Sequence, residues 1–180
     1  MIKSIETSHG TIVIREASMA DAEQFRDLRL YALQESPTSF SSDYQTNLNH
    51  PLEYWQNRLR DTEEAVTFFA EQEHRLIGMS GIACGYSSKT KHSATIYSVF
   101  IHPEWRGFRI AKALLETCIE WARSKEVNIV KLGVNATNTS AIRCYRRCGF
   151  TIYGTEPNAL LYEGRYYDEY LMFKELDLKS

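Results

Sequence analysis

The stretch from Ser98 to Leu115 constrains the fold most, because it predicts a strand, a tight turn and the start of a long amphipathic helix. Pro103 cannot donate a hydrogen bond to a sheet, so the strand should end at Ile101 or His102. After the turn, apolar residues recur at helical spacing, at Ile110, Ala111, Leu114, Leu115, Cys118, Ile119 and Ala122. We therefore expect a helix that begins near Ile110.

The turn before this helix has the chemistry of an anion site. The first turn of a helix offers free backbone N–H groups and the positive end of the helix dipole. Arg106, Arg109 and Lys112 add positive charge, and Gly107 lets the backbone come close to a ligand. These features suit a pyrophosphate, although an ordinary strand–helix unit with a basic first turn is the alternative interpretation.

A second stretch, from Lys131 to Phe150, predicts another strand, a loop and a short helix that ends at Gly149. The Arg-Gly turn, followed by Asn138-x-x-Ala141-x-x-x-Tyr145-x-x-x-Gly149-Phe150, resembles the GNAT superfamily of acetyl-CoA-dependent N-acetyltransferases. The resemblance covers Ile96–Phe150 in detail and the remainder in outline. It departs from the family pattern at Arg109, where the family turn usually has a second glycine.

The resemblance implies a single α/β (α+β) domain over residues 1–180, with its core at about 11–176. Its mixed, mostly antiparallel sheet should have about seven strands and about four helices, with the central parallel strands splayed to admit CoA. Periodicity predicts strands over Thr11–Glu16, Val66–Glu71, Leu76–Tyr86, His92–Ile101, Ile129–Asn135, Phe150–Tyr153 and Tyr167–Leu176. It predicts helices over Met19–Leu33, from Pro51, from Ile110 and over Ser140–Cys148. Three consecutive apolar residues, Leu171 to Phe173, predict that the last strand is covered on both faces.

The resemblance also implies how acetyl-CoA, the acetyl donor, is held. Its pyrophosphate would contact the turn formed by Arg106, Gly107, Phe108, Arg109, Ile110, Ala111 and Lys112. Its pantetheine arm would pair with the backbone at Val99 and Ile101, with Asn138 and Ser140 beside it. Tyr145 would be the general acid, because a phenol with a pKa of about 10 can protonate a departing thiolate at neutral pH.

The acceptor site is less defined by the sequence. Phe40 and Tyr44 either line the acceptor pocket or pack against the sheet, and Tyr166 lies in a tyrosine-rich segment that fits an acceptor loop or a homodimer interface. A general base is needed because an amine is mostly protonated at neutral pH. The strand Ala94–Ile101 contains no carboxylate, which leaves open Glu71, Glu73, Asp168, Glu169 or a chain of waters. Glu71 is also a candidate for binding the substrate.

These residues favour an N-acetyltransferase that acetylates a primary amine of a small molecule such as an amino acid, a polyamine or an amine drug. The alternatives are a transferase that acts on a protein N-terminus or lysine, and a non-catalytic acyl-CoA-binding module. A nucleic-acid binder built on the arginines of the two helices is disfavoured by the net charge of −2.

Further expectations follow from the composition and from the spacing of particular residues. No run is long enough to span a membrane, and the first residues lack the apolar core of a signal peptide. We therefore expect a cytoplasmic protein whose four cysteines are reduced. Cys144 and Cys148 are four residues apart on one helix but have no Cys-x-x-Cys or paired histidines beside them, so we expect no metal site.

Overall fold

The computed structural model describes residues 2–60 and 62–177, which form an eight-stranded mixed sheet. The strands lie in the order β1-β2-β3-β4-β5-β6-β8-β7, and every neighbouring pair is antiparallel except β5 and β6. Their bounds are β1 Lys3–Thr7, β2 Gly10–Glu16, β3 Ala65–Gln72, β4 Arg75–Cys84, β5 Ser93–Ile101, β6 Ile129–Asn135, β7 Thr151–Tyr162 and β8 Arg165–Glu175. This confirms the predicted mixed, mostly antiparallel sheet.

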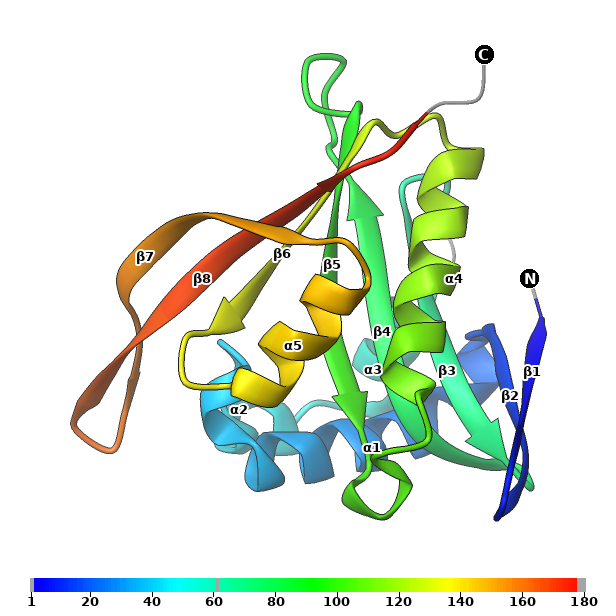
Figure 1. The fold of residues 1–180 in the computed structure, drawn as a ribbon. Coiled ribbons are helices and arrows are strands. Elements are labelled where there is room, and N and C mark those ends of the chain that lie inside the picture. The colour runs from blue at the N-terminus through cyan, green and yellow to red at the C-terminus, as the bar shows by residue number, and fades with distance from the viewer. Residues whose placement is uncertain (1, 61, 178–180) are drawn as a thin grey trace.

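The helices cover the two faces of the sheet. They are α1 Ala22–Glu35, α2 Tyr44–Leu48, α3 Leu52–Arg58, α4 Ile110–Ser124 and α5 Thr139–Arg147, with short 3₁₀ helices at Met19–Asp21, Pro37–Ser39 and Pro103–Trp105. Figure 1 shows α4 and α5 on one face of the sheet and α1 to α3 on the other. The hairpin of β7 and β8 extends to one side (Figure 1).

Each face has its own apolar core. Leu114, Leu115 and Cys118 of α4 are fully buried against the sheet, in the cluster that also contains Tyr145 of α5. On the other face, Phe25 of α1 and Trp55 of α3 pack in a second cluster with residues of β3, β4 and β5. The 3.6-residue periodicity of α4 thus places its apolar stripe on the sheet and leaves the start of the helix at the sheet edge.

The two parallel strands separate after a short common stretch. β5 and β6 pair only at Ser93–Thr95 and Ile129–Lys131. Farther along β5, Ser98 has a left-handed backbone with φ 55°, and the register of β4 against β5 shifts between Met79 and Gly81. Such a bulge bends the strand and redirects its side chains, so the gap between β5 and β6 opens at this point.

The structure adds elements that the sequence did not predict and corrects two predictions. Strand β1 and helix α2 are additional. The segment around Gly154 and Pro157, which lies between the predicted strands Phe150–Tyr153 and Tyr167–Leu176, belongs to the continuous edge strand β7, where two register shifts accommodate the irregular residues. The prediction that the last strand is covered on both faces is wrong for its flanking residues. Of Leu171, Met172 and Phe173, only Met172 is fully buried.

Candidate functional site

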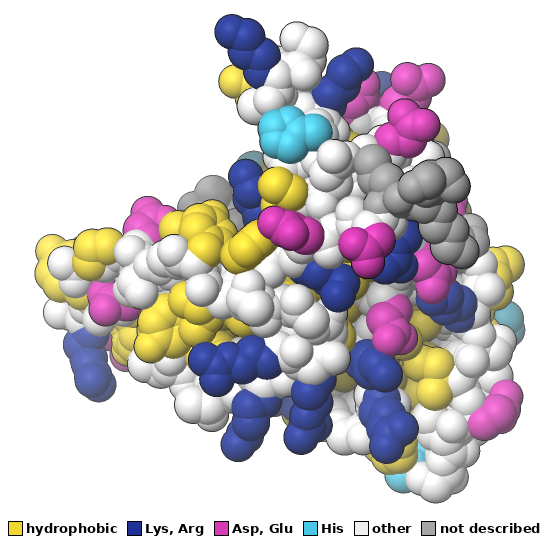
Figure 2. Space-filling view, turned by 45° about the horizontal axis from the view of Figure 1, so that its top comes forward, with side chains coloured by type: hydrophobic (Ala, Val, Ile, Leu, Met, Phe, Trp, Pro, Cys, Tyr) yellow, Lys and Arg dark blue, Asp and Glu magenta, His cyan; other side chains and the backbone are white. Residues whose placement is uncertain are grey.

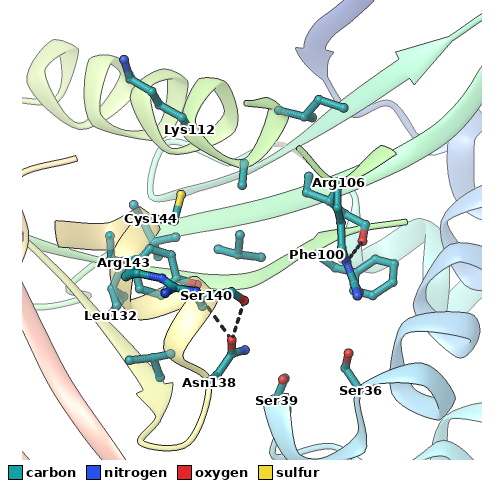
Figure 3. A pocket seen from close by; sticks show the side chains of 18 of the residues that line it. Ser36, Ser39, Phe100, Arg106, Lys112, Leu132, Asn138, Ser140, Arg143 and Cys144 are labelled. Atoms are coloured by element: carbon teal, nitrogen blue, oxygen red, sulfur yellow. Dashed lines mark hydrogen bonds between the residues drawn. The ribbon is translucent and has the colours of Figure 1, made fainter. Parts of the chain in front are cut away.

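A cavity of about 870 Å³ lies where β5 and β6 separate. Its walls come from five parts of the chain: β5, β6, the turn that begins α4, one side of α5, and the segment from Ser36 to Phe40. Figure 3 shows Asn138 and Cys144 on one side of this space, Arg106 and Phe100 across from them, and Ser36 and Ser39 on a third side. The gap in the sheet therefore becomes an open channel that ends at the start of α4.

The turn before α4 presents uncompensated positive potential to this cavity. Gly107 and Arg109 both have left-handed backbones, with φ of 92° and 61°. Arg109 is the N-cap residue of α4, and no side chain caps the helix there. The first backbone N–H groups of an α-helix have no acceptor within the helix, so those of Ile110, Ala111 and Lys112 remain available to a ligand. All of these residues line the cavity.

Further cations surround the same channel. Lys112, Arg143 and Arg147 line it together with Arg109, and none of the three arginines forms an ion pair with a described residue. Figure 2 shows several Lys and Arg side chains gathered on the face of the molecule that carries α4 and α5. The sequence drew attention to Arg143 and Arg147 only as part of a disfavoured nucleic-acid patch. Their spacing along one helix from Ser140 could have assigned them to the cavity.

Arg106 lies at the cavity, where its guanidinium pairs with a carboxylate of α1. It donates two hydrogen bonds to the Glu35 carboxylate, at 3.0 and 2.8 Å, and a third from Nε to the carbonyl of Ile101, at 3.2 Å. The Arg106 hydrogen bond, outweighing burial, lowers the pKa of Glu35. The Arg106 side chain therefore joins the turn to the end of α1, and its contact with phosphate stays a prediction.

Phe108, also predicted to belong to the pyrophosphate turn, does not line the cavity. Its side chain is absent from the cavity wall among the described residues and packs on the core beneath α4. Its ring meets that of His9 edge-on, at 4.8 Å between centroids. An alternation of outward and inward residues in the turn explains this placement, since Gly107 and Arg109 on either side face the cavity.

The start of α5 forms the opposite wall. The Asn138 side-chain oxygen accepts hydrogen bonds from the Ser140 hydroxyl and the Ala141 N–H, both at 3.1 Å, and so caps the helix (Figure 3). The Asn138 amide nitrogen donates to no described residue and remains free to meet a ligand. Asn135, which the sequence did not single out, is buried and donates to the carbonyl of Thr38 at 2.9 Å, so it holds the Ser36–Phe40 wall against β6.

Tyr145 lies inside the cavity on α5, with 7% of its surface exposed. Burial raises the pKa of its phenol, and the nearby Cys144, Cys148 and Glu169 add to the shift. Its ring packs edge-on against Phe150, with centroids 6.3 Å apart, and its hydroxyl makes no hydrogen bond to a described residue. The structure thus holds a protonated, unengaged donor at the wall of the cavity.

Three of the four carboxylates considered as general bases lie elsewhere. Glu71 accepts from Arg15 Nε at 2.6 Å, and Arg15 also holds Asp21 with two bonds of 2.8 Å. Glu73 lies in the turn between β3 and β4. Asp168 accepts the backbone N–H of Asn158 at 2.9 Å. None of these three lines the cavity, and Glu71, also a candidate for binding the substrate, belongs to the Arg15 ion cluster. Its role toward the substrate stays a prediction.

Glu169 differs from the other three. It pairs with Asn135 across β6–β8, and its carboxylate covers Gly133, which lines the cavity. A Cβ atom at Gly133 would approach the Glu169 Oε2 atom to 2.7 Å, so glycine makes room for this carboxylate. Glu169 has no hydrogen bond or ion pair with a described residue. Burial, and to a smaller degree the facing Glu156, raises its pKa.

Of the three aromatic residues predicted for the acceptor site, one lines the cavity and two do not. Phe40 lines the cavity, whereas Tyr44 packs against the α1–α3 core instead. Tyr166, 65% exposed in the β7–β8 hairpin, lies outside the cavity wall because the hairpin extends away from the sheet. The homodimer expected from the tyrosine-rich hairpin stays a prediction. Tyr97 and Ser98 of β5 line the cavity although neither was placed in the site.

Among the described residues, no three His, Cys, Asp or Glu side chains are grouped so that they could hold a metal ion. No helix in the described ranges combines the length and the apolar character needed to cross a bilayer.

A family profile, the sequences of known proteins and solved structures all relate the chain to acetyltransferases. The profile of the Acetyltransferase (GNAT) family matches residues 28–150. The chain is 29% identical over 166 residues to the L-amino acid N-acetyltransferase AaaT of Escherichia coli, covering 89% of this chain and 96% of that protein. It is 25% identical over 142 residues to the L-methionine sulfoximine/L-methionine sulfone acetyltransferase of Salmonella typhimurium, covering 71% and 82%.

Two solved structures share the fold. An acetyltransferase of the GNAT family from Streptococcus pneumoniae superposes with a TM-score of 0.82 at 23% identity, covering 92% of this chain and 99% of that one. The ribosomal-protein-alanine N-acetyltransferase from Brucella melitensis superposes with a TM-score of 0.74 at 26% identity, covering 91% and 99%.

Proposed function

Because the chain belongs to the acetyltransferase (GNAT) family and is an acetyl-CoA-dependent N-acetyltransferase, we propose that it acetylates the primary amine of a small molecule, with Tyr145 as general acid. The observation that carries this proposal is Tyr145, buried at the cavity wall, whose hydroxyl has a raised pKa and no hydrogen bond to a described residue. The names of two relatives, which describe acetylation of amino acids, support a small acceptor.

The cavity fits the acetyl donor by its shape and charge. The uncapped first turn of α4 and the unpaired Arg109, Arg143 and Arg147 supply a site for the diphosphate. The separated strands leave backbone groups of Val99 and Ile101 on the wall, where an amide-containing arm can pair as a strand would. Bound there, acetyl-CoA supplies an acetyl group activated as a thioester.

Acetyl transfer exchanges a carbon–sulfur bond for a carbon–nitrogen bond, and it also requires two proton transfers. The amine nitrogen forms a bond to the acetyl carbon while the carbon–sulfur bond breaks, so a proton must leave nitrogen and one must reach sulfur. Tyr145 donates to the sulfur, and its raised pKa keeps it protonated until that moment. Its hydroxyl then regains a proton from solvent through the open channel.

Glu169 receives the proton of the amine. Of the four carboxylates considered, it alone lies beside a residue of the cavity wall and has no competing partner among the described residues. Its raised pKa brings it closer to that of an amine and so makes it a better acceptor. Gly133 is part of this arrangement, because a side chain there would displace the carboxylate.

The experiment is steady-state acetyl transfer to a panel of amines, measured by thiol release, for the parent and Tyr145→Phe. The variant keeps the ring and its packing but loses the proton, so kcat should fall at least tenfold, within the ~10²–10⁴ range of general acid catalysis. The KM for acetyl-CoA should stay nearly constant.

Two results would contradict the proposal. Turnover of Tyr145→Phe within twofold of the parent from pH 6 to 9 would show that the tyrosine only packs. Acetylation of peptide N-termini with no activity on any small amine would replace the small acceptor with a protein.

A further inference from the structure

A second, smaller cavity of about 170 Å³ adjoins the first at the β5 bulge. Tyr97 and Ser98 line both cavities. The rest of the smaller wall comes from Phe25, Arg58, Thr67, Met79, Ser80 and Gly81, on the face of the sheet covered by α1 and α3. Glycine at 81 makes room for the Tyr97 ring, which would collide with any side chain there. The smaller cavity is thus a side chamber of the first, on the acceptor side of the sheet.

Arg29 lies beside this chamber as a buried charge without a counter-ion. Only 3% of its surface is exposed, and no carboxylate among the described residues pairs with it. Its guanidinium lies over the Phe40 ring, 4.4 Å from the centroid, and donates long hydrogen bonds to the hydroxyls of Ser98, at 3.4 Å, and Ser42, at 3.3 Å. The Nε atom is buried and has no acceptor.

Arg58 brings a second guanidinium to the same place. It lines the chamber from the end of α3, donates to the Tyr54 hydroxyl at 3.2 Å, and has no carboxylate partner in the described chain. Burial, and after it the charge of Arg58, lowers the pKa of Arg29 to about 10, which leaves Arg29 charged at neutral pH. One guanidinium without a carboxylate partner among the described residues therefore lines the chamber, and a second lies behind its Ser98 wall.

Such an arrangement is unfavourable in the absence of an anion. Burial of an uncompensated charge is costly, and two like charges raise that cost further. A carboxylate placed between the guanidiniums would accept the forked N–H donors that the serine hydroxyls satisfy only at long distance. The chamber is too small to hold a diphosphate-bearing ligand. It opens at Tyr97 and Ser98 onto the cavity that contains Tyr145.

We propose that Arg29 and Arg58 form a subsite for the carboxylate of the acceptor, and that the acceptor is a free amino acid rather than a simple amine or a peptide. This inference rests on the proposed function, and it specifies the substrate class. With the carboxylate in the chamber, the amine of the same molecule lies toward the Ser98 bulge and the larger cavity. Phe25 and Met79 give the chamber an apolar wall that accommodates an uncharged side chain.

The first test is binding, which does not depend on turnover. Calorimetry of the CoA-saturated protein with each of the common L-amino acids and with its carboxamide should show binding of at least one amino acid and weaker binding of the matching amide. Because charge-assisted hydrogen bonds contribute most of this difference, the amide should bind about tenfold to a hundredfold more weakly. Inorganic phosphate serves as the probe for a general anion site.

Variants of Arg58 and Arg29, with a matched control, test whether these residues cause the preference for amino acid over amide. Arg58→Gln should remove most of the preference for amino acid over amide. Arg29→Lys, which keeps the charge but loses the fork, should reduce it in part. Arg60→Gln is the control, because Arg60 is exposed two residues farther on and bonds Asn57. Thermal unfolding of each variant identifies any that fails to fold, and Arg58→Gln, on the half-buried residue, is the variant that decides.

Each outcome has one meaning. Equal binding of amino acids and amides, or no binding of any amino acid, overturns the subsite. Unchanged preference in Arg58→Gln does so too, and so does tight binding of phosphate that amino acids do not displace. If amines without a carboxylate are acetylated as fast as amino acids, the acetyl-transfer proposal stands and the carboxylate subsite fails.

Discussion

At the residue scale, the site depends on which ionisable groups have partners. Arg15 forms hydrogen bonds with both Asp21 and Glu71, and Arg106 forms them with Glu35. Tyr145 and Glu169 have no such partners among the described residues, and both have raised pKa values because they are buried. Groups with perturbed pKa values beside a cavity are candidates for proton transfer, which is why these two carry the proposed chemistry.

Glu169→Gln tests the second of these groups. We expect kcat/KM to fall by ~10²–10⁴, the usual value of a positioned base, with the low-pH limb of the parent's profile flattened in the variant. The groups that face Glu169 are Glu156 on β7, which adds to its raised pKa, and Tyr145 on α5. Asp168→Asn, on the adjacent residue bonded to Asn158, is the matched control.

The same substitution, which should lower activity, should raise the stability of the fold. A carboxyl whose folded pKa is raised stabilises the fold below its unfolded pKa, and this contribution is lost as the pH rises through the folded pKa. At neutral pH the Glu169 charge therefore destabilises the parent, and Glu169→Gln should melt at a higher temperature. A variant that loses both activity and stability would indicate a structural role for Glu169 instead.

At the scale of the element, the turn into α4 combines strain with charge. Arg109 is held in the left-handed region, which costs a non-glycine residue about 1–2 kcal/mol and which asparagine tolerates better. The side chain is exposed at the cavity and has no ion pair with a described residue. The strained backbone places the N–H groups of the helix toward the channel, and the guanidinium adds charge at the same point.

Arg109→Asn separates these two contributions. Asparagine keeps the left-handed turn and removes the charge, so CoA should bind more weakly, with a loss that is larger at low ionic strength than at high. Arg109→Lys keeps the charge and should stay close to the parent. Tighter CoA binding in Arg109→Asn, measured by calorimetry, would instead mean that the arginine crowds the turn.

At the scale of the whole molecule, the cavity is closed by contacts between distant parts of the chain. Asn135 at the end of β6 holds Thr38, and Arg106 before α4 holds Glu35 at the end of α1. These contacts bring both faces of the sheet to the rim of one channel. A ligand that fills the channel contacts both faces and should therefore stabilise the entire fold.

We expect acetyl-CoA at a hundredfold excess over its dissociation constant to add about 2.7 kcal/mol to the free energy of unfolding. For a chain of this length that corresponds to a rise of about 5–10 °C in Tm. Scanning calorimetry with and without the ligand measures the rise, and Arg109→Asn should show a smaller one at the same ligand concentration. Destabilisation or no change in the parent would show that acetyl-CoA does not bind the folded protein in preference to the unfolded chain.

The sequence alone determined the elements whose signals are local. The apolar spacing after Ile110 predicted α4 almost to its first residue, and the stretch from Lys131 to Phe150 predicted the short helix that carries Tyr145. Both depend on helical periodicity and capping, which act within a few residues. The separation of two parallel strands was expected from the family resemblance, and the structure confirms it.

Only the tertiary structure decided which side chains have partners. Arg106 and Glu35 are 71 residues apart, and Arg29 and Ser98 are 69 apart, so no spacing along the chain connects them. The carboxylate of Glu169 is singled out by a glycine on a neighbouring strand, and Arg29 by the lack of a carboxylate partner among the described residues. The strength of an ionisable group as a base or an anion site depends on its burial and neighbours, and packing between distant elements determines both.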